Sequence, residues 1–378
     1  MKVLIAVTHL LGTGHLSRAL TLGRAFAMAG HPVSVVSGGG EAQHLDQSGV
    51  ELMQLPPLRS DGVDFSRLLT PDGAVADDAY FDDRIFQLCN CLRDMQPDVL
   101  ITELYPFGRR SLRREFIALL AAAKSLPRRP VILSSIRDIL APPSTPKKAN
   151  EAEAALAAHY DGVLVHSDPQ ATQLATSWPV TPALSKMLRY TGYVAPQVPD
   201  PHPQGLGQGE ILVSGGGGSV GDALYRTAVA AAQLRPGMRW RILVGGRDAR
   251  ARIAALKTSK SPAVLEPARP DFRQMLDGAA ASVSMCGYNT ALDLLQTGVP
   301  AVIVPFDAGK EVEQSLRANS LTQLNGIAAI TSAELTPERL CAAVDQVIAA
   351  PQRPTDSFRF DGAARTVEIA HDMAKERA

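Results

Sequence analysis

Val3-Leu4-Ile5-Ala6-Val7-Thr8-His9 runs into Gly12-Thr13-Gly14-His15-Leu16-Ser17-Arg18, and this junction decides the fold. Five apolar residues in a row predict a short buried strand, and the glycines after them permit a tight turn into a helix. A secretory signal would have a small-residue cleavage site where Thr8, His9 and the glycine loop stand. We therefore interpret the apolar run as a first strand and not as a targeting segment.

Short β-rich runs alternate with longer amphipathic runs along the rest of the chain, which predicts an α/β fold of parallel sheets with helices on both faces. Strands are expected at 2–8, 33–37, 98–102, 130–135, 162–166, 210–214, 240–244, 263–266, 281–285, 300–304 and 327–330. Helices are expected at 15–29, 82–95, 111–124, 149–159, 221–234, 248–257, 271–278, 288–297, 311–324, 337–349 and 360–376. Residues 56–81 are expected to form a long polar loop.

A segment rich in proline and glycine divides this pattern in two. Residues 195–208 hold four prolines and two glycines without periodicity, which is typical of an interdomain linker. In doubly wound sheets, ligands bind outside the carboxyl ends of the strands, so we expect the site in a cleft between two domains. We predict a Rossmann-like domain, a linker, a second Rossmann-like domain and a C-terminal helix that packs back on the first domain, at residues 1–195, 196–209, 210–350 and 351–378.

Composition excludes several classes of protein. The chain has 378 residues, with 38 Lys and Arg against 38 Asp and Glu, so its formal net charge is zero. A protein that binds nucleic acid with its whole surface is normally basic. No apolar run approaches the roughly 20 residues of a membrane-spanning helix. The four cysteines are scattered without zinc-like spacing, which fits a reducing cytoplasm and predicts no metal site.

The zero net charge hides two charged stretches. Residues 60–83 hold seven Asp and one Arg, a net charge of −6. Residues 109–148 hold ten Lys and Arg against Glu115 and Asp138, a net charge of +8. Such stretches are often only solvated faces.

The first candidate site is the glycine loop that precedes His15. The start of a helix offers unpaired N–H groups to an anion, and Gly14 permits close approach of a ligand. No acidic residue ends the second expected strand, which argues against a dinucleotide site. The ordinary pKa of histidine suits proton abstraction near neutral pH, so His15 is a candidate general base. The alternative is a histidine that only caps the helix.

Two further candidate sites follow strands of the second domain. Ser214-Gly215-Gly216-Gly217-Gly218-Ser219 can present successive N–H groups to a phosphate, although it lacks the Gly-Lys-Ser/Thr of a P-loop. Ser284-Met285-Cys286-Gly287-Tyr288-Asn289-Thr290 opens a helix with polar residues that suit a diphosphate, and Asp293, one turn later, can hold a vicinal diol. Glu313 and Gln314, in the segment that begins at Lys310, can hydrogen-bond neighbouring sugar hydroxyls. Ordinary turns and helix capping are the alternatives in each case.

The order of these motifs resembles the donor-binding half of the GT-B glycosyltransferases, in particular the group of the peptidoglycan-precursor N-acetylglucosaminyltransferase. The resemblance rests on Ser284, Gly287, Thr290, Asp293, Gly298-x-Pro300, Val304-Pro305-Phe306, Glu313-Gln314 and Arg317-Ala318. It is closer still to a set of bacterial predicted glycosyltransferases. Their hallmarks stand here at residues 9–18, at Pro97–Arg110, at Ser135-Ile136-Arg137-Asp138-Ile139-Leu140 and at Tyr190-Thr191-Gly192-Tyr193-Val194.

The resemblance implies a GT-B fold with an acceptor in the first domain and a nucleotide-sugar, a UDP-sugar by preference, in the second. It implies no obligatory metal or other cofactor, because helix dipoles and backbone amides stabilise the leaving diphosphate. Asp293 would hold the ribose, and Glu313 and Gln314 the donor sugar. The chain departs from the peptidoglycan-precursor N-acetylglucosaminyltransferase at two positions of this pattern. It has Met285 where that enzyme has Arg, and Asp293 where that enzyme has Glu. The remaining donor-side candidates are Gly14, Ser214, Gly216, Gly217, Arg247, Ser284, Gly287, Tyr288, Asn289 and Thr290.

The basic stretch gains an interpretation from the same resemblance. Arg109 and Arg110 follow the strand that ends near Glu103, and Arg137 ends the neighbouring strand, so all three are expected on the acceptor side. Arginines there suit an anionic acceptor or the headgroups of a membrane that holds a lipid-linked acceptor. A solvated or internally paired cluster is the alternative. Glu103 is either a second catalytic base or the partner of an arginine.

We predict a glycosyltransferase, inverting by analogy, in which His15 takes the proton of the acceptor hydroxyl. The alternatives are a nucleotide-sugar hydrolase or epimerase of the same fold and, less favoured, a non-catalytic nucleotide-sugar binding protein. The expected location is cytoplasmic, with peripheral contact to the inner membrane face left open.

Overall fold

The computed structural model describes residues 1–10, 12–43, 45–60, 67–218, 220–257, 261–308 and 311–377. Leu11, Ser219 and Lys310, which belong to the motifs above, therefore lie outside the described residues, as do residues 61–66 of the expected loop. Within the described residues, every strand and helix expected from the sequence is present, and two all-parallel sheets confirm the predicted fold class.

The chain divides into two compact units, and each is described by itself. The first unit holds Met1–Pro169, Gln173–Val194 and Arg359–Ala378, and the second holds Gln170–Thr172 and Ala195–Phe358. Residues 351–358, which we grouped with the C-terminal helix, thus belong to the second unit. The reason is Arg353, whose buried guanidinium donates hydrogen bonds to the carbonyl oxygens of Leu294 and Val299.

The sheet of the first unit has seven parallel strands in the order β3-β2-β1-β4-β5-β6-β7. Their bounds are Glu51–Gln54 for β3, Val33–Ser37 for β2, Val3–Val7 for β1, Val99–Glu103 for β4, Val131–Arg137 for β5, Gly162–His166 for β6 and Leu188–Tyr190 for β7. The chain order reverses between β1 and β4. Ligands of such sheets bind beside this switch point, at the carboxyl ends of the strands.

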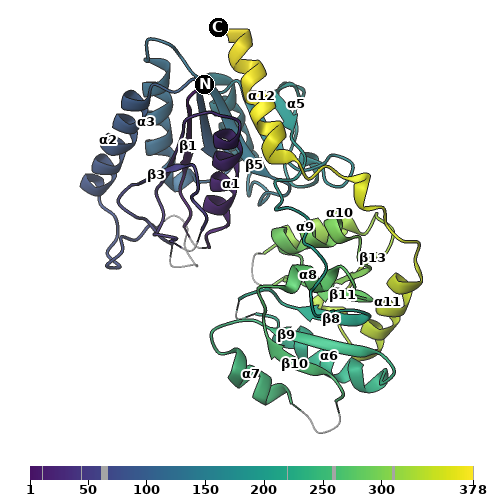
Figure 1. The fold of residues 1–378 in the computed structure, drawn as a ribbon. Coiled ribbons are helices and arrows are strands. Elements are labelled where there is room, and N and C mark those ends of the chain that lie inside the picture. Colours follow the sequence, from purple (N-terminus) through teal and green to yellow (C-terminus); the bar gives the residue numbers. More distant parts are fainter. Residues whose placement is uncertain are drawn as a thin grey trace. The chain divides into compact units, whose positions relative to one another are not determined.

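Alternate residues of the central strands in the first unit face two separate cores. Leu4 and Ala6 pack with α2 (Asp78–Met95), α3 (Arg113–Lys124) and α4 (Pro146–His159) on one face. Val3, Ile5 and Val7 pack on the other face with α1 (Gly14–Met28) and α12 (Gly362–Arg377). Figure 1 shows α12, in yellow, beside α1. Both faces of the sheet are therefore buried, as its apolar strands require.

The second unit repeats this design with six parallel strands in the order β10-β9-β8-β11-β12-β13. Helices α6, α7 and α11 pack on one face, and Figure 1 shows α8, α9 and α10 on the other. The strands are β10 (Val264–Pro267), β9 (Arg239–Val244), β8 (Glu210–Ser214), β11 (Ala281–Ser284), β12 (Ala301–Ile303) and β13 (Ile327–Ala329). The helices are α6 (Asp222–Leu234), α7 (Ala249–Leu256), α8 (Phe272–Leu276), α9 (Tyr288–Thr297), α10 (Glu313–Leu321) and α11 (Pro337–Ala349).

Candidate functional site

His15 lies in the first turn of α1, directly after the glycine turn that follows β1. Its Nδ1 is 2.8 Å from Oε1 of Glu103, the last residue of β4. The Glu103 side chain is 2% exposed and that of His15 is 17% exposed. The structure therefore joins the two residues that the sequence offered separately as catalytic candidates, at the switch point of the sheet.

Glu103 has two further partners that fully engage its carboxylate. Arg18, one turn after His15 on α1, donates from Nη2 to Oε1 of Glu103. The hydroxyl of Ser135, in β5, donates to Oε2 over 2.6 Å. We offered Glu103 as a base or as the partner of an arginine, and the structure pairs it with Arg18 and not with the basic stretch after residue 108.

The surroundings of the pair determine where the protons lie. Burial lowers the pKa of His15 to about 4, although Glu103 opposes the shift. Burial alone would raise the pKa of Glu103, but Arg18 and His15 outweigh it and hold that pKa well below its usual range. Near neutral pH the imidazole is thus uncharged and the carboxylate ionised. The Nδ1–H group donates to Glu103, which leaves the lone pair of Nε2 as a proton acceptor.

A chain of buried polar groups extends from Glu103 across the sheet. The Ser135 hydroxyl also lies 3.0 Å from Nε2 of His166, at the end of β6, and Nδ1 of His166 lies 2.9 Å from the Thr191 hydroxyl. All three are fully buried, and burial lowers the pKa of His166 to about 3. We did not predict His166. Its only signal is its place at the carboxyl end of a strand next but one to β4.

The three acceptor-side arginines do not form one cluster. Arg109 is half-buried, with a left-handed backbone (φ 60°), and its guanidinium donates to no described residue. Burial lowers its pKa to about 10, while the Glu103 carboxylate opposes this. Arg137 donates to the carbonyl oxygen of Ile139 over 3.1 Å. Arg110 instead lines a small hollow with Lys148 and Glu151. Of the three, only Arg109 is half-buried near the pair with no hydrogen bond to a described residue.

In the second unit, the glycine loop after β8 is locked to the loop after β9. The buried Tyr225 hydroxyl accepts hydrogen bonds from the N–H groups of Gly215 (3.1 Å) and Gly245 (3.3 Å). A Cβ atom at Gly245 would stand 2.1 Å from the carbonyl oxygen of Gly216, so no other residue fits there. The N–H of Gly216 donates to Ser214 Oγ, and Gly217 and Gly218 are the exposed residues that follow.

The turn from β11 into α9 has the form expected of a phosphate site. Gly287 is the N-cap of the helix and has no side chain to cap the first turn, where Tyr288, Asn289 and Thr290 stand. Asn289 is exposed and Thr290 half-buried. Ser284, by contrast, is fully buried, and its hydroxyl has no hydrogen-bond partner among the described residues, so it does not face solvent as a ligand contact would.

Asp293 is buried and already engaged. Nε of Arg273, on α8, donates to Oδ1 of Asp293 over 2.5 Å, and its Nη2 donates to Gln296 Oε1 over 2.8 Å. Burial raises the pKa of Asp293 although Arg273 opposes it. The second oxygen, Oδ2, has no hydrogen bond to a described residue. Arg273 was not predicted from the sequence.

Gln314 has an amide group of fixed orientation. Its Oε1 accepts hydrogen bonds from the N–H groups of Cys286 (3.0 Å) and Phe306 (3.1 Å). These two donors identify the oxygen, so Nε2 is the end that remains for a ligand. Glu311 caps the same helix and accepts from the N–H of Glu313 over 2.7 Å. Arg247, the remaining candidate, is exposed and follows Gly246, whose N–H donates to Gly217.

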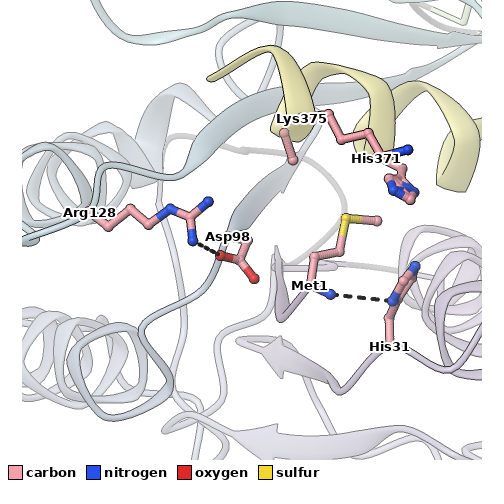
Figure 2. Close-up of a pocket in the computed structure, with 7 residues that line it drawn as sticks. Met1, His31, Asp98, Arg128, His371 and Lys375 are labelled. Carbon is pink, nitrogen blue, oxygen red and sulfur yellow. Dashed lines mark hydrogen bonds and ion pairs between the residues drawn. The ribbon is translucent and has the colours of Figure 1, made fainter. Parts of the chain in front are cut away.

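A separate hollow lies in the first unit, at the end of the strands opposite to His15 and Glu103. Figure 2 shows it lined by Met1, His31, Asp98, Arg128, His371 and Lys375. Asp98 directly precedes β4 and accepts from the backbone N–H of Lys2, so the hollow stands at the amino ends of the strands. It contains none of the candidate residues, and ligands of such sheets bind at the other edge.

Over the described residues, no helix is long and apolar enough to cross a membrane. Nor does any group of three or more His, Cys, Asp or Glu residues among them stand where it could hold a metal ion.

Two protein-family models match the chain. Residues 211–371 match the Glycosyltransferase family 28 C-terminal domain, and residues 13–189 match the Glycosyl transferase 4-like domain. The two matches fall in the two halves of the chain and together leave out only residues 1–12, 190–210 and 372–378.

Curated relatives match a shorter stretch. The chain is 29% identical over 143 residues to the UDP-N-acetylglucosamine–N-acetylmuramyl-(pentapeptide) pyrophosphoryl-undecaprenol N-acetylglucosamine transferase of Brucella anthropi, which is 36% of this chain and 38% of that protein. The transferase of the same name from Corynebacterium efficiens is 29% identical over 162 residues, 42% of each chain. The matched stretch thus spans about two-fifths of the length of these relatives.

Solved structures show the same fold over the whole chain. MurG of Acinetobacter baumannii aligns with a TM-score of 0.61 at 16% identity and covers 100% of this chain and 94% of its own. The glycosyltransferase of kitacinnamycin aligns with a TM-score of 0.62 at 19% identity and covers 100% and 95%.

Proposed function

Because the chain belongs to the family-28-like group of GT-B glycosyltransferases, we propose that it moves a sugar from a nucleotide-diphosphate sugar to an acceptor hydroxyl. The observation that carries the proposal is the His15–Glu103 pair at the switch point of the first sheet. It presents an uncharged imidazole, held in one tautomer, with Nε2 free to take a proton.

The proposed step is a single displacement. The acceptor oxygen attacks the anomeric carbon of the donor while its proton passes to Nε2 of His15, and the bond from that carbon to the diphosphate breaks. The diphosphate leaves with the bonding electrons, and N–H groups at the start of α9 and at Gly217 would stabilise its charge.

Inversion of the anomeric centre follows from this step. Retention by double displacement needs an accessible carboxylate as nucleophile. Glu103 does not suit that role, because it is 2% exposed and both its oxygens accept hydrogen bonds. We therefore propose an inverting reaction. The anomeric configuration of the product, determined by NMR, tests this proposal. We also propose that no metal is required, so that EDTA leaves the rate unchanged.

On the donor side, we propose that Asp293 Oδ2 accepts from a ribose hydroxyl and that Gln314 Nε2 donates to the sugar. UDP is the favoured nucleotide, because the curated relatives are named for a UDP-sugar. A thermal-shift screen against UDP-, GDP-, dTDP- and ADP-sugars tests this, because a ligand that binds only the folded state raises its Tm. A shift with none of them would overturn the proposal.

Incubation of the shifting donor without an acceptor then distinguishes transfer from hydrolysis. Slow release of sugar, accelerated by an acceptor extract, is the result expected of a transferase. Rapid stoichiometric release without any acceptor would mean that water is the natural nucleophile.

The acceptor is proposed to carry an anionic group close to the hydroxyl that reacts. Arg109 supports this, because it is a half-buried cation near Glu103 with no hydrogen bond to a described residue. An anion would supply that partner, and a hydrogen bond to a charged group is worth about 1.5–3 kcal/mol. The relatives named for a pyrophosphoryl-undecaprenol acceptor fit the same chemistry. A cytoplasmic protein with peripheral membrane contact would meet such an acceptor.

Arg109→Gln is expected to lower kcat/KM about tenfold or more for a phosphorylated acceptor and to leave an uncharged analogue unaffected. Paired acceptors, such as a sugar phosphate and its methyl glycoside, measure the difference. Arg110→Gln is the matched control, because that exposed side chain lines a different hollow. Equal losses with both acceptors would contradict the assignment of Arg109.

A further inference from the structure

Arg18 shares one carboxylate oxygen with His15. Its Nη2 donates to Oε1 of Glu103, the same atom that accepts from Nδ1 of His15, and it lies 3.2 Å from that Nδ1. Arg18 is 7% exposed and Glu103 2%. Removing such a charged pair from water costs solvation free energy. The packing of a helix face alone therefore does not explain why an arginine stands at position 18.

Within the part of the chain that the structure describes, the charges that act on His15 come from three segments. Glu103 on β4 is the anion, while Arg18 on α1 and Arg109 after β4 are cations. On the far side of Glu103 stand the Ser135 hydroxyl and His166, which burial holds uncharged. A protonated His15 would therefore be a third cation facing one carboxylate.

We propose that Arg18 is a positioning residue that neutralises Glu103, so that the carboxylate orients the imidazole of His15 without favouring its protonated form. This inference rests on the proposed role of His15 as the base. A histidine paired with a free carboxylate would be drawn toward the imidazolium form, which has no lone pair to accept a proton. With Arg18 in place, the carboxylate keeps its hydrogen bond to Nδ1 while its charge is already balanced.

The consequence is that His15, the proposed base, stays unprotonated in mildly acidic solution. Because the pKa of His15 lies at about 4, its base form persists down to about pH 5 and is lost only as the pH falls through 4. Removing Arg18 takes away a repelling cation and leaves the attraction of Glu103 unbalanced. Both changes favour the imidazolium, so the titration must move to higher pH.

The experiment is an NMR titration of His15 in the full chain labelled with 13C at histidine Cε1. The chain has eight histidines, and His15→Gln assigns the resonance. Arg18→Met is expected to raise the titration midpoint by about one pH unit, the scale of a nearby charge. Arg18→Lys, which keeps the cation, is the matched control and is expected to leave it nearly unchanged. A midpoint in Arg18→Met equal to that of the wild type would overturn the proposal.

A double variant keeps the test decisive if Arg18→Met unfolds. Arg18→Met/Glu103→Gln removes the buried pair as a unit, so neither partner is left unpaired. The midpoint is then expected to return to its low value, because burial and the nearby Arg109, which both lower the pKa of His15, remain. A midpoint raised in the double variant as in the single one would also overturn the proposal.

The titration needs no turnover, so it separates this inference from the proposed function. If the His15 midpoint moves in Arg18→Met and the acid limb of kcat/KM moves with it, both proposals are supported. If the midpoint moves and the acid limb does not, the role of Arg18 stands and that of His15 as the base fails.

Discussion

His15→Ala is expected to lower kcat for sugar transfer by about 10²–10⁴-fold, the contribution of a positioned general base. The alanine cannot accept the proton of the acceptor hydroxyl, and Glu103 cannot replace it because the carboxylate is buried and its oxygens are engaged. Donor affinity is expected to change by less than about twofold, because most donor-side candidates lie in the second unit. Product formation under saturating donor and acceptor measures kcat, and calorimetry measures donor binding.

His31→Ala is the matched control for that experiment. His31 lines the hollow at the amino ends of the strands (Figure 2), away from the carboxyl ends where His15 stands, so its loss should leave transfer unchanged. Wild-type turnover in His15→Ala would remove the histidine from the mechanism, whatever the donor proves to be.

Arg84→Met is expected to destabilise the first unit by about 3–5 kcal/mol, the usual cost of stranding one member of a buried ion pair. Arg84, on α2, is fully buried and donates to both carboxylate oxygens of Glu115, on α3, over 2.6 and 3.0 Å. Its Nη1 also donates to the carbonyl oxygens of Gly38 and Pro56, which would lose a buried donor. Urea unfolding at neutral pH, followed by a probe in the first unit, measures the loss.

Arg114→Met provides the comparison on the same pair of helices. Arg114, on α3, bridges to Asp78 and Asp82, but all three side chains are at least half exposed, so its loss should cost at most about 1 kcal/mol. Arg84→Met/Glu115→Leu should recover part of the stability, because no buried charge is then stranded. Equal losses in Arg84→Met and Arg114→Met would show that burial of the Arg84 pair has no energetic consequence.

The regular elements of both sheets could be predicted from the sequence because their burial on two faces requires continuous apolar runs. The elements that were missed lack that signal. Strand β3 lies at an edge with exposed glutamate and glutamine at its ends, β7 has only three residues, and α5 (Pro182–Met187) has only six. Helix α2 begins at Asp78, four residues before the predicted start, because the side chain of Asp77 accepts the N–H of Tyr80 and caps it.

The site was predicted as single residues but not as a network. His15 and Glu103 are 88 positions apart, and nothing local indicates that they touch. Arg18 was visible within the quoted motif, yet its direction toward Glu103 depends on how α1 packs against β4. Arg109 and Arg110 are adjacent residues of the same type, and nothing local in the sequence distinguishes them. In the structure, Arg109 has a left-handed backbone and Arg110 does not. Asp293 and Gln314 were predicted as ligand contacts, and the structure adds internal partners for one carboxylate oxygen of Asp293 and for the amide oxygen of Gln314.

The discontinuity of the first unit has a consequence for the order of events during synthesis. The ribosome makes Arg359–Arg377 after the whole of the second unit, yet Ile369 and Ala370 are buried against the same core as β1 and α1. Until α12 emerges, the apolar residues that it covers in this core lack that cover, whereas the second unit has all but three of its residues in one uninterrupted segment. The first half of the chain to be translated is thus the last to complete its core, and it is the half that a chaperone would have to shield.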